Sequence, residues 1–145
     1  MAEPDKRTQG FTLVELMVVL VIIALAAAAV VLAMPEPGGS VESEAVRFAA
    51  RTKAARDQAI LESRPVAVQV GGGGYEVARR VGGAWRAEAH YDWVDETVAE
   101  IAGTRSGSIR FDSTGLAEPA FVVLRRGGRR ATVEISGDGG VHVRP

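Results

Sequence analysis

The chain has 145 residues and a formal net charge of −1 at pH 7. A balance this close to neutral excludes a global field that would attract nucleic acid or a membrane surface. Cysteine is absent, so disulfides are excluded and packing alone must hold the fold.

Residues 11–34 form the most apolar part of the chain, with one charge at Glu15 and none from residue 16 to residue 34. A helix over this range is about 36 Å long, enough to cross a hydrocarbon core of about 30 Å. A buried core helix would need apolar partners around its whole circumference, and the remaining chain is too short and polar to supply them. A cleaved secretory signal usually has an apolar run of only about 7–15 residues. We therefore predict a membrane-spanning helix.

The residues before this helix predict its orientation in the membrane and resemble a known processing site. Lys6 and Arg7 precede it, which places the N-terminus in the cytoplasm and residues 35–145 outside, in the periplasm of a bacterium with two membranes. The order of a polar leader, Gly10, Phe11 and then Glu15 resembles the processing site of type IV pilins and pseudopilins. The resemblance implies that a prepilin peptidase removes leader 1–10, cleaving between Gly10 and Phe11 and methylating the new N-terminus. It also implies that Glu15 acts in filament assembly.

A physical argument supports that role for Glu15. An ionised side chain inside the bilayer costs about 2.5–3.5 kcal/mol, so it usually has a partner. The new amine at Phe11 of a neighbouring subunit offers one, because unit charges 4 Å apart attract by about 4 kcal/mol at an effective dielectric of about 20. The alternative is that Glu15, about 6 Å from the helix start, reaches the interface and stays solvated.

Residues 35–40 read Pro-Glu-Pro-Gly-Gly-Ser, and two prolines with two glycines predict a break in the helix. Related pilins usually carry one long helix from the membrane into the globular domain. We therefore expect this chain to join its anchor and its domain flexibly, at least before assembly.

A second helix is predicted over residues 41–64, with Ser40 as its N-cap and an end at about Arg64, before Pro65. Its apolar and small residues fall at steps of three and four, with Ile60 at the edge: Val41, Ala45, Phe48, Ala49, Thr52, Ala55 and Ala59. The flanks and far side carry the charges Glu44, Arg47, Arg51, Lys53, Asp57 and Glu62, and Arg56 borders the stripe. This pattern predicts an amphipathic helix packed on the domain.

Residues 65–145 show a period of two in short Val-rich runs separated by glycines, which predicts an antiparallel β domain, either a single sheet or a sandwich. The candidate strands are 66–70, 75–81, 85–87, 97–101, 108–111, 120–126, 129–136 and 141–144. The predicted turns lie at 71–74, 82–83, 127–128 and 137–140. The fold class is therefore α+β.

The last third of the chain resembles a particular group within the pilins and pseudopilins. The run Phe111-Asp112-Ser113-Thr114-Gly115, followed by Pro119, Gly128-Arg129 and Gly139-Gly140-Val141, is similar to GspH/FimT-type minor pseudopilins and minor pilins. The resemblance implies a pilin-like fold and, as partners, major and minor pseudopilins, a prepilin peptidase, an inner-membrane assembly platform and secreted cargo. It implies no cofactor. From the residues alone, Asp112 predicts an Asx turn and Gly115 a conformation closed to other residues.

The residues give little support to catalysis or metal binding. His90 and His142 are isolated from any nucleophile or metal-ligand spacing. The acidic patch Asp92, Asp95 and Glu96 lacks an EF-hand spacing, and a solvated loop with a buried Trp93 is the favoured interpretation. We expect no enzyme activity, no metal and no cofactor.

Arg125, Arg126, Arg129 and Arg130 surround a predicted two-residue turn at Gly127-Gly128. In that register Arg126 faces Arg129 and Arg125 faces Arg130, while Leu124 with Ala131 and Val122 with Val133 point to the core. Like charges directly opposite are unfavourable, so the cluster needs free solvent or an anionic partner. The open interpretations are a solvated tip that blocks strand-edge pairing, a contact with an acidic patch on a neighbouring subunit, and a contact with nucleic-acid phosphate.

Three functional hypotheses follow. The first is a minor pseudopilin of a type II secretion pseudopilus, inserted in the inner membrane and then packed in or at the tip of the pseudopilus for protein export across the outer membrane. The alternative is a minor pilin of a type IV pilus, including one that binds DNA in uptake. The third is a generic single-span protein, which would keep Met1 in the mature product.

Overall fold

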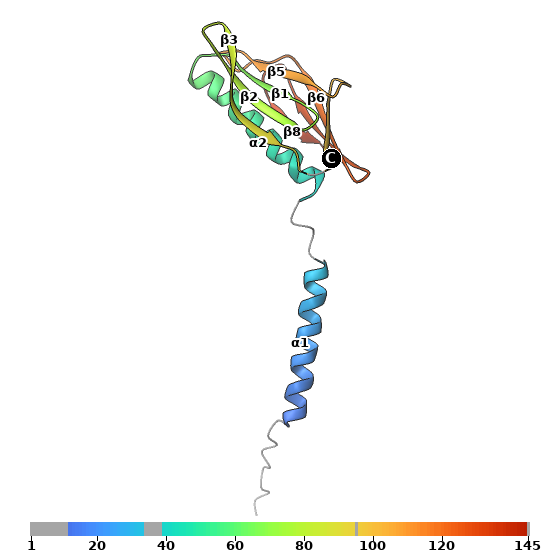
Figure 1. The fold of residues 1–145 in the computed structure, drawn as a ribbon. Helices are drawn as coiled ribbons and strands as arrows, with labels where there is room; N and C mark the ends of the chain where they lie inside the picture. Colours follow the sequence, from blue (N-terminus) through green and yellow to red (C-terminus); the bar gives the residue numbers. More distant parts are fainter. Residues whose placement is uncertain (1–11, 34–38, 95, 145) are drawn as a thin grey trace, which may run out of the picture. The chain divides into compact units, whose positions relative to one another are not determined.

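The computed structural model describes residues 12–33, 39–94 and 96–144. The chain divides into two compact units, residues 1–36 and 37–145. The first contains helix α1 (Leu13–Ala33) and the second contains helix α2 (Val41–Leu61) with a set of antiparallel strands (Figure 1). The predicted leader, the Gly10–Phe11 processing site, the last residue of the predicted helix 11–34 and residues 35–38 of the predicted break lie outside the described residues.

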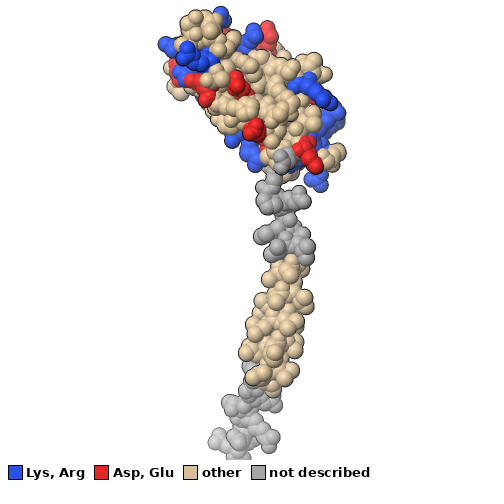
Figure 2. Space-filling view, viewed as in Figure 1, with Lys and Arg blue, Asp and Glu red and all other residues tan. Residues whose placement is uncertain are grey.

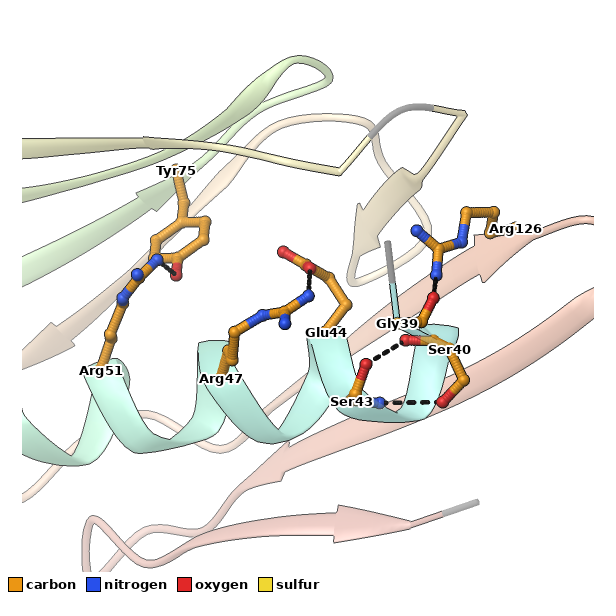
Figure 3. Close-up of polar contacts among 8 residues, drawn as sticks. All are labelled: Gly39, Ser40, Ser43, Glu44, Arg47, Arg51, Tyr75 and Arg126. Carbon is orange, nitrogen blue, oxygen red and sulfur yellow. Dashed lines mark hydrogen bonds and ion pairs between the residues drawn. The ribbon is translucent and has the colours of Figure 1, made fainter. Parts of the chain in front are cut away.

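Helix α2 begins as predicted. Ser40 is its N-cap, and the Ser40 side chain accepts a hydrogen bond from the backbone N–H of Ser43 at 3.2 Å (Figure 3). This bond satisfies one of the N–H groups that a helix start leaves without an intrahelical partner. The predicted stripe is confirmed, since these seven of its residues are buried: Val41, Ala45, Phe48, Ala49, Thr52, Ala55 and Ala59.

The prediction that Glu44 lies on an exposed flank is wrong, because its residue is only 3% exposed. Glu44 stands one turn after Val41 and one turn before Phe48, so the helix places it beside the buried stripe. Its carboxylate accepts a hydrogen bond from Arg47 at 2.5 Å, which gives the buried charge a partner (Figure 3).

Helix α2 also ends earlier than predicted, at Leu61 rather than Arg64. The backbone turns to a positive φ of 51° at Ser63, and the N–H of Arg64 bonds the carbonyl of Ala59 at 3.1 Å. Pro65 disfavours a helical conformation at the residue before it, so the reversal is completed ahead of the first strand.

The strands form two four-stranded antiparallel sheets, with the orders β3-β2-β1-β5 and β4-β6-β7-β8. Their bounds are β1 Val66–Val70, β2 Gly74–Val81, β3 Ala84–Asp92, β4 Val98–Ile101, β5 Gly107–Phe111, β6 Ala120–Arg126, β7 Arg129–Ile135 and β8 Val141–Arg144. Seven of these agree with the predicted strands to within one residue at each end. The exception is β3, which was predicted only over residues 85–87. It is an edge strand without a buried residue, so its sequence lacks the expected apolar alternation.

The core lies where α2 packs against strands of both sheets, namely β1, β5, β6, β7 and β8 (Figure 1). At its centre the rings of Phe48 and Tyr75 meet edge to face, with centroids 4.8 Å apart. Trp93 packs on both rings and donates its Nε1–H to the carbonyl of Gly71 at 2.9 Å. The predicted buried tryptophan is therefore confirmed, with its polar atom satisfied.

Arg56 links the other half of α2 to two turns of the β domain. Its guanidinium donates to the carbonyl of Gly115 at 3.2 Å and to that of Asp138 at 3.1 Å. Gly115 has the predicted positive φ, 82°, and Asp112 accepts hydrogen bonds from the N–H groups of Thr114 and Leu116, which confirms the Asx turn. The hydrogen bonds from Thr114 hold the pKa of Asp112 below its usual range.

Candidate assembly site

The first candidate site is the surface of α1. None of the 18-residue apolar window Leu13–Val30 is buried, and among the described residues α1 is the one helix long and apolar enough to cross a membrane. The visible face of its described part carries no Lys or Arg (Figure 2). An apolar surface of this extent needs lipid or other helices around it, because exposure to water is unfavourable.

Glu15 lies in the first turn of α1 and is the one charged residue of that helix. Its backbone N–H donates to the Oγ1 of Thr12 at 3.2 Å. Thr12-Leu13-Val14-Glu15 therefore begins α1 with the Ser/Thr-x-x-Glu pattern of a helix start. This capping was missed from the sequence, although the spacing is visible there. It fixes where α1 begins and places the Glu15 carboxylate at its positive end.

The second candidate site is the β6–β7 hairpin, which has the predicted register. Arg126 pairs with Arg129, Arg125 with Arg130, Leu124 with Ala131 and Val122 with Val133. Both turn glycines have positive φ, 56° at Gly127 and 77° at Gly128, as a two-residue turn of the I′ type requires. We call residues 125–130 the arginine hairpin.

Arg125 and Arg126 of the arginine hairpin have partners within the domain, which was not among the interpretations of the cluster from the sequence. Arg126 is half-buried and donates a hydrogen bond to the backbone carbonyl of Gly39, just before the N-cap of α2 (Figure 3). Arg125 lies 3.8 Å from the carboxylate of Glu100 on β4. Arg129 and Arg130 are exposed, and neither forms an ion pair with a residue that the structure describes.

The arginine hairpin also acts on the start of α2. A hydrogen bond with Ser40 is the main cause that lowers the pKa of Glu42, and the charges of Arg129 and Arg126 lower it further. Basic side chains gather along the edge of the domain that carries the arginine hairpin (Figure 2).

The other titratable residues singled out in the sequence do not come together as a site. His90 and His142 are exposed on β3 and β8, and His90 contacts Asp92 at 3.1 Å. Within residues 12–33, 39–94 and 96–144, no three His, Cys, Asp or Glu side chains are grouped as metal ligands. Asp95 lies outside the described residues, and the expected absence of enzyme activity stays a prediction.

Sequence reasoning missed one further surface feature, around Trp85 on β3. The guanidinium carbons of Arg80 and Arg110 each lie 6.0 Å from the centroid of its ring. The three side chains line an open hollow of about 340 Å³ together with residues that include Leu116, which is 52% exposed. They come from β2, β3 and β5 of one sheet, with β1 between β2 and β5, so their meeting depends on the strand order and was not visible in the sequence.

Comparison with known families identifies both parts of the chain. A family described as the prokaryotic N-terminal methylation motif matches residues 5–31. The family of the type II transport protein GspH matches residues 44–139, more than half of the chain. The chain belongs to the GspH family. The predicted resemblance is therefore confirmed, and a search of curated proteins adds no match.

Solved structures confirm the α+β, pilin-like fold of this GspH-family chain. The type IV minor pilin FimU of Pseudomonas aeruginosa aligns with a TM-score of 0.62 at 17% identity, over 72% of this chain and 88% of FimU. The minor pseudopilin EpsH of the Vibrio cholerae type 2 secretion system gives 0.62 at 11% identity, over 73% and 97%. GspH of E. coli gives 0.56 at 18% identity, over 70% and 84%. Pilins and pseudopilins thus share this fold.

Proposed function

We propose that the protein is a minor pseudopilin of a type II secretion pseudopilus, a structural component in or near the tip that serves protein export across the outer membrane. The methylation motif over residues 5–31 and the GspH match over residues 44–139 support this proposal together. The fold it shares with GspH and EpsH is consistent with it.

The observation that carries the proposal is the surface of α1. It is apolar and unburied from Leu13 to Val30, and its one carboxylate stands in the first turn. Membrane anchoring alone needs the apolar surface but not the carboxylate, which insertion into a bilayer opposes. A filament of packed α1 helices uses both, because side chains pack along the helices and Glu15 receives a cationic partner.

The assembly mechanism follows from this arrangement. Lys6 and Arg7 keep the N-terminus in the cytoplasm, so α1 crosses the inner membrane and the β domain lies in the periplasm. A prepilin peptidase cleaves between Gly10 and Phe11 and methylates the Phe11 amine. That amine pairs with Glu15 of a neighbouring subunit as the inner-membrane platform moves the protein into the pseudopilus. Helix α2 and the β domain then contact other pseudopilins and secreted cargo.

The test is a deletion of the gene in its own organism, complemented with the full chain. We expect the deletion to stop export of secreted proteins to the medium while pilus-dependent motility and DNA uptake stay normal. Normal export together with lost motility or uptake would contradict the proposal and favour the type IV minor pilin.

That second candidate has one observation in its favour, the exposed pair Arg129 and Arg130. A DNA-binding pilin would use them on phosphates. Because Arg125 and Arg126 have partners within the domain, only about two phosphates would be neutralised. The slope of log affinity against log salt would then be about −1.8. So few phosphate contacts make DNA the less favoured partner.

A further inference from the structure

The tip of the arginine hairpin carries two cations available to an outside partner. Arg129 and Arg130 are exposed and form no ion pair with a described residue, whereas Arg125 is beside Glu100 and Arg126 is bonded to Gly39. A guanidinium presents a planar set of donors that matches a phosphate group in a bidentate contact. The chemistry of the tip therefore suits a phosphate-bearing partner.

Chain length limits where this tip can go while α1 is in a membrane. The 21 residues of α1 give a helix about 31 Å long, which matches a hydrocarbon core of about 30 Å. Six residue steps separate Ala33 from Gly39, and they span at most about 22 Å when fully extended. Arg126 is bonded to Gly39, so its guanidinium lies one hydrogen bond beyond this limit and the base of the hairpin one arginine side chain further. This limit follows from covalent length and requires no particular orientation of the domain.

A short tether raises the effective concentration of the tip at the membrane surface. Groups joined by a short covalent tether meet at effective concentrations that reach about the millimolar range, so contacts too weak to bind a free partner become populated. Two arginines are few for DNA, which binds through many phosphates, but they suffice for a surface that is already nearby.

We propose that Arg129 and Arg130 bind anionic phospholipid headgroups of the membrane that holds α1, and that they dock the β domain on the bilayer before assembly. Each basic residue near an anionic membrane surface contributes a factor of about five in binding, so the pair contributes about 25-fold. This inference rests on α1 spanning a membrane and is independent of which filament the protein joins.

The experiment uses the full chain in lipid nanodiscs. Because the sequence has no cysteine, a single Val98→Cys substitution on β4, opposite Arg125, takes one fluorophore. Lipids with a nitroxide on the headgroup quench the fluorophore at short range. We expect stronger quenching in discs with about 30 mol% phosphatidylglycerol than in phosphatidylcholine alone, and loss of that difference at high salt.

Three double variants test whether Arg129 and Arg130 cause the lipid response. Arg129→Gln/Arg130→Gln should lower the ratio of docked to undocked domain about 25-fold. Arg129→Lys/Arg130→Lys keeps the charge and should keep most of the lipid response. The matched control Arg64→Gln/Arg105→Gln removes two exposed arginines elsewhere and should behave as the parent does. Equal melting temperatures show that each variant is folded.

Equal quenching in the two lipid compositions would overturn the proposal, as would an equal loss in the control variant. Quenching that depends on Arg129 and Arg130 only when partner pseudopilins are added would assign the tip to an acidic protein surface instead. Dependence on added DNA alone would assign it to nucleic acid. Either result contradicts lipid docking.

Discussion

Arg126 donates a hydrogen bond to the backbone carbonyl of Gly39, 87 positions earlier in the chain. The bond joins the β6–β7 hairpin to the residue that precedes the N-cap of α2 (Figure 3). The folded domain therefore includes Gly39 and Ser40, which were predicted as the end of the break at residues 35–40. The boundary of the second compact unit, at Pro37, agrees with this.

We predict that the fragment 37–145 folds by itself with a cooperative melt and with helix and strand signals in circular dichroism. A fragment 41–145 lacks both the Ser40 cap and the Gly39 carbonyl. Its free energy of unfolding should be about 1–3 kcal/mol lower in urea titrations, since a helix cap and a hydrogen bond to a charged group each contribute about 1 kcal/mol or more. Equal stability of the two fragments would show that these contacts do not form in solution.

A second prediction concerns Arg56, which bonds the carbonyls of Gly115 and Asp138. Arg56→Gln removes both contacts and should lower the free energy of unfolding of fragment 37–145 by about 1–2 kcal/mol. Lys53→Gln is the control, because Lys53 is exposed on the same helix, and it should change stability by less than about 0.5 kcal/mol. Similar losses in the two variants would argue against the bonds of Arg56.

The two Asx-type turns predict a pH dependence. A hydrogen bond from the Thr114 side chain is the main cause that lowers the pKa of Asp112, and one from the Ser136 side chain lowers that of Asp138. A lowered pKa stabilises the fold above the ordinary aspartate value of about 3.9, and this contribution is lost as pH falls through the pKa of the folded state. Asp112→Asn/Asp138→Asn should therefore flatten the fall of melting temperature below about pH 4. If the melting temperature of the double variant falls below about pH 4 as steeply as that of the parent, other carboxylates cause the acid sensitivity.

Sequence patterns predicted those parts of the fold that depend on neighbours along the chain. The α2 stripe from Val41 to Ala59 and the register of the arginine hairpin follow from periodicity and from a two-residue glycine turn, and both are confirmed. The order of strands in the two sheets was not predictable, because pairings such as β1 with β5 join segments far apart in sequence.

Three features that sequence reasoning missed have the same origin. The buried Glu44 depends on where α2 meets the sheets, and the length of β3 depends on its pairing with β2, which includes a bulge between Val77 and Ala78. The bond between Arg126 and Gly39 spans most of the domain. By contrast, Thr12 and Glu15 stand three residues apart, so their pairing at the start of α1 was visible in the sequence.

The role proposed for Glu15 is tested by substitution in the full chain. Glu15→Ala should leave membrane insertion and processing intact but lower co-purification with partner pseudopilins by about tenfold or more, because it removes an attraction of about 4 kcal/mol. Thr12→Val is the matched control, since it removes the cap on the Glu15 N–H but keeps the carboxylate. Normal co-purification of the Glu15→Ala protein would refute the assembly role, and an equal defect in Thr12→Val would show that the loss does not depend on the carboxylate.

The identity of the first residue of the mature protein tests the central claim most directly. The protein should be purified from membranes of its own organism and its N-terminal peptide measured by mass spectrometry. A pseudopilin processed as proposed begins at Phe11, lacks residues 1–10 and carries one methyl group on its terminal amine. A mature chain that keeps Met1, or that begins at any residue other than Phe11, would contradict the account.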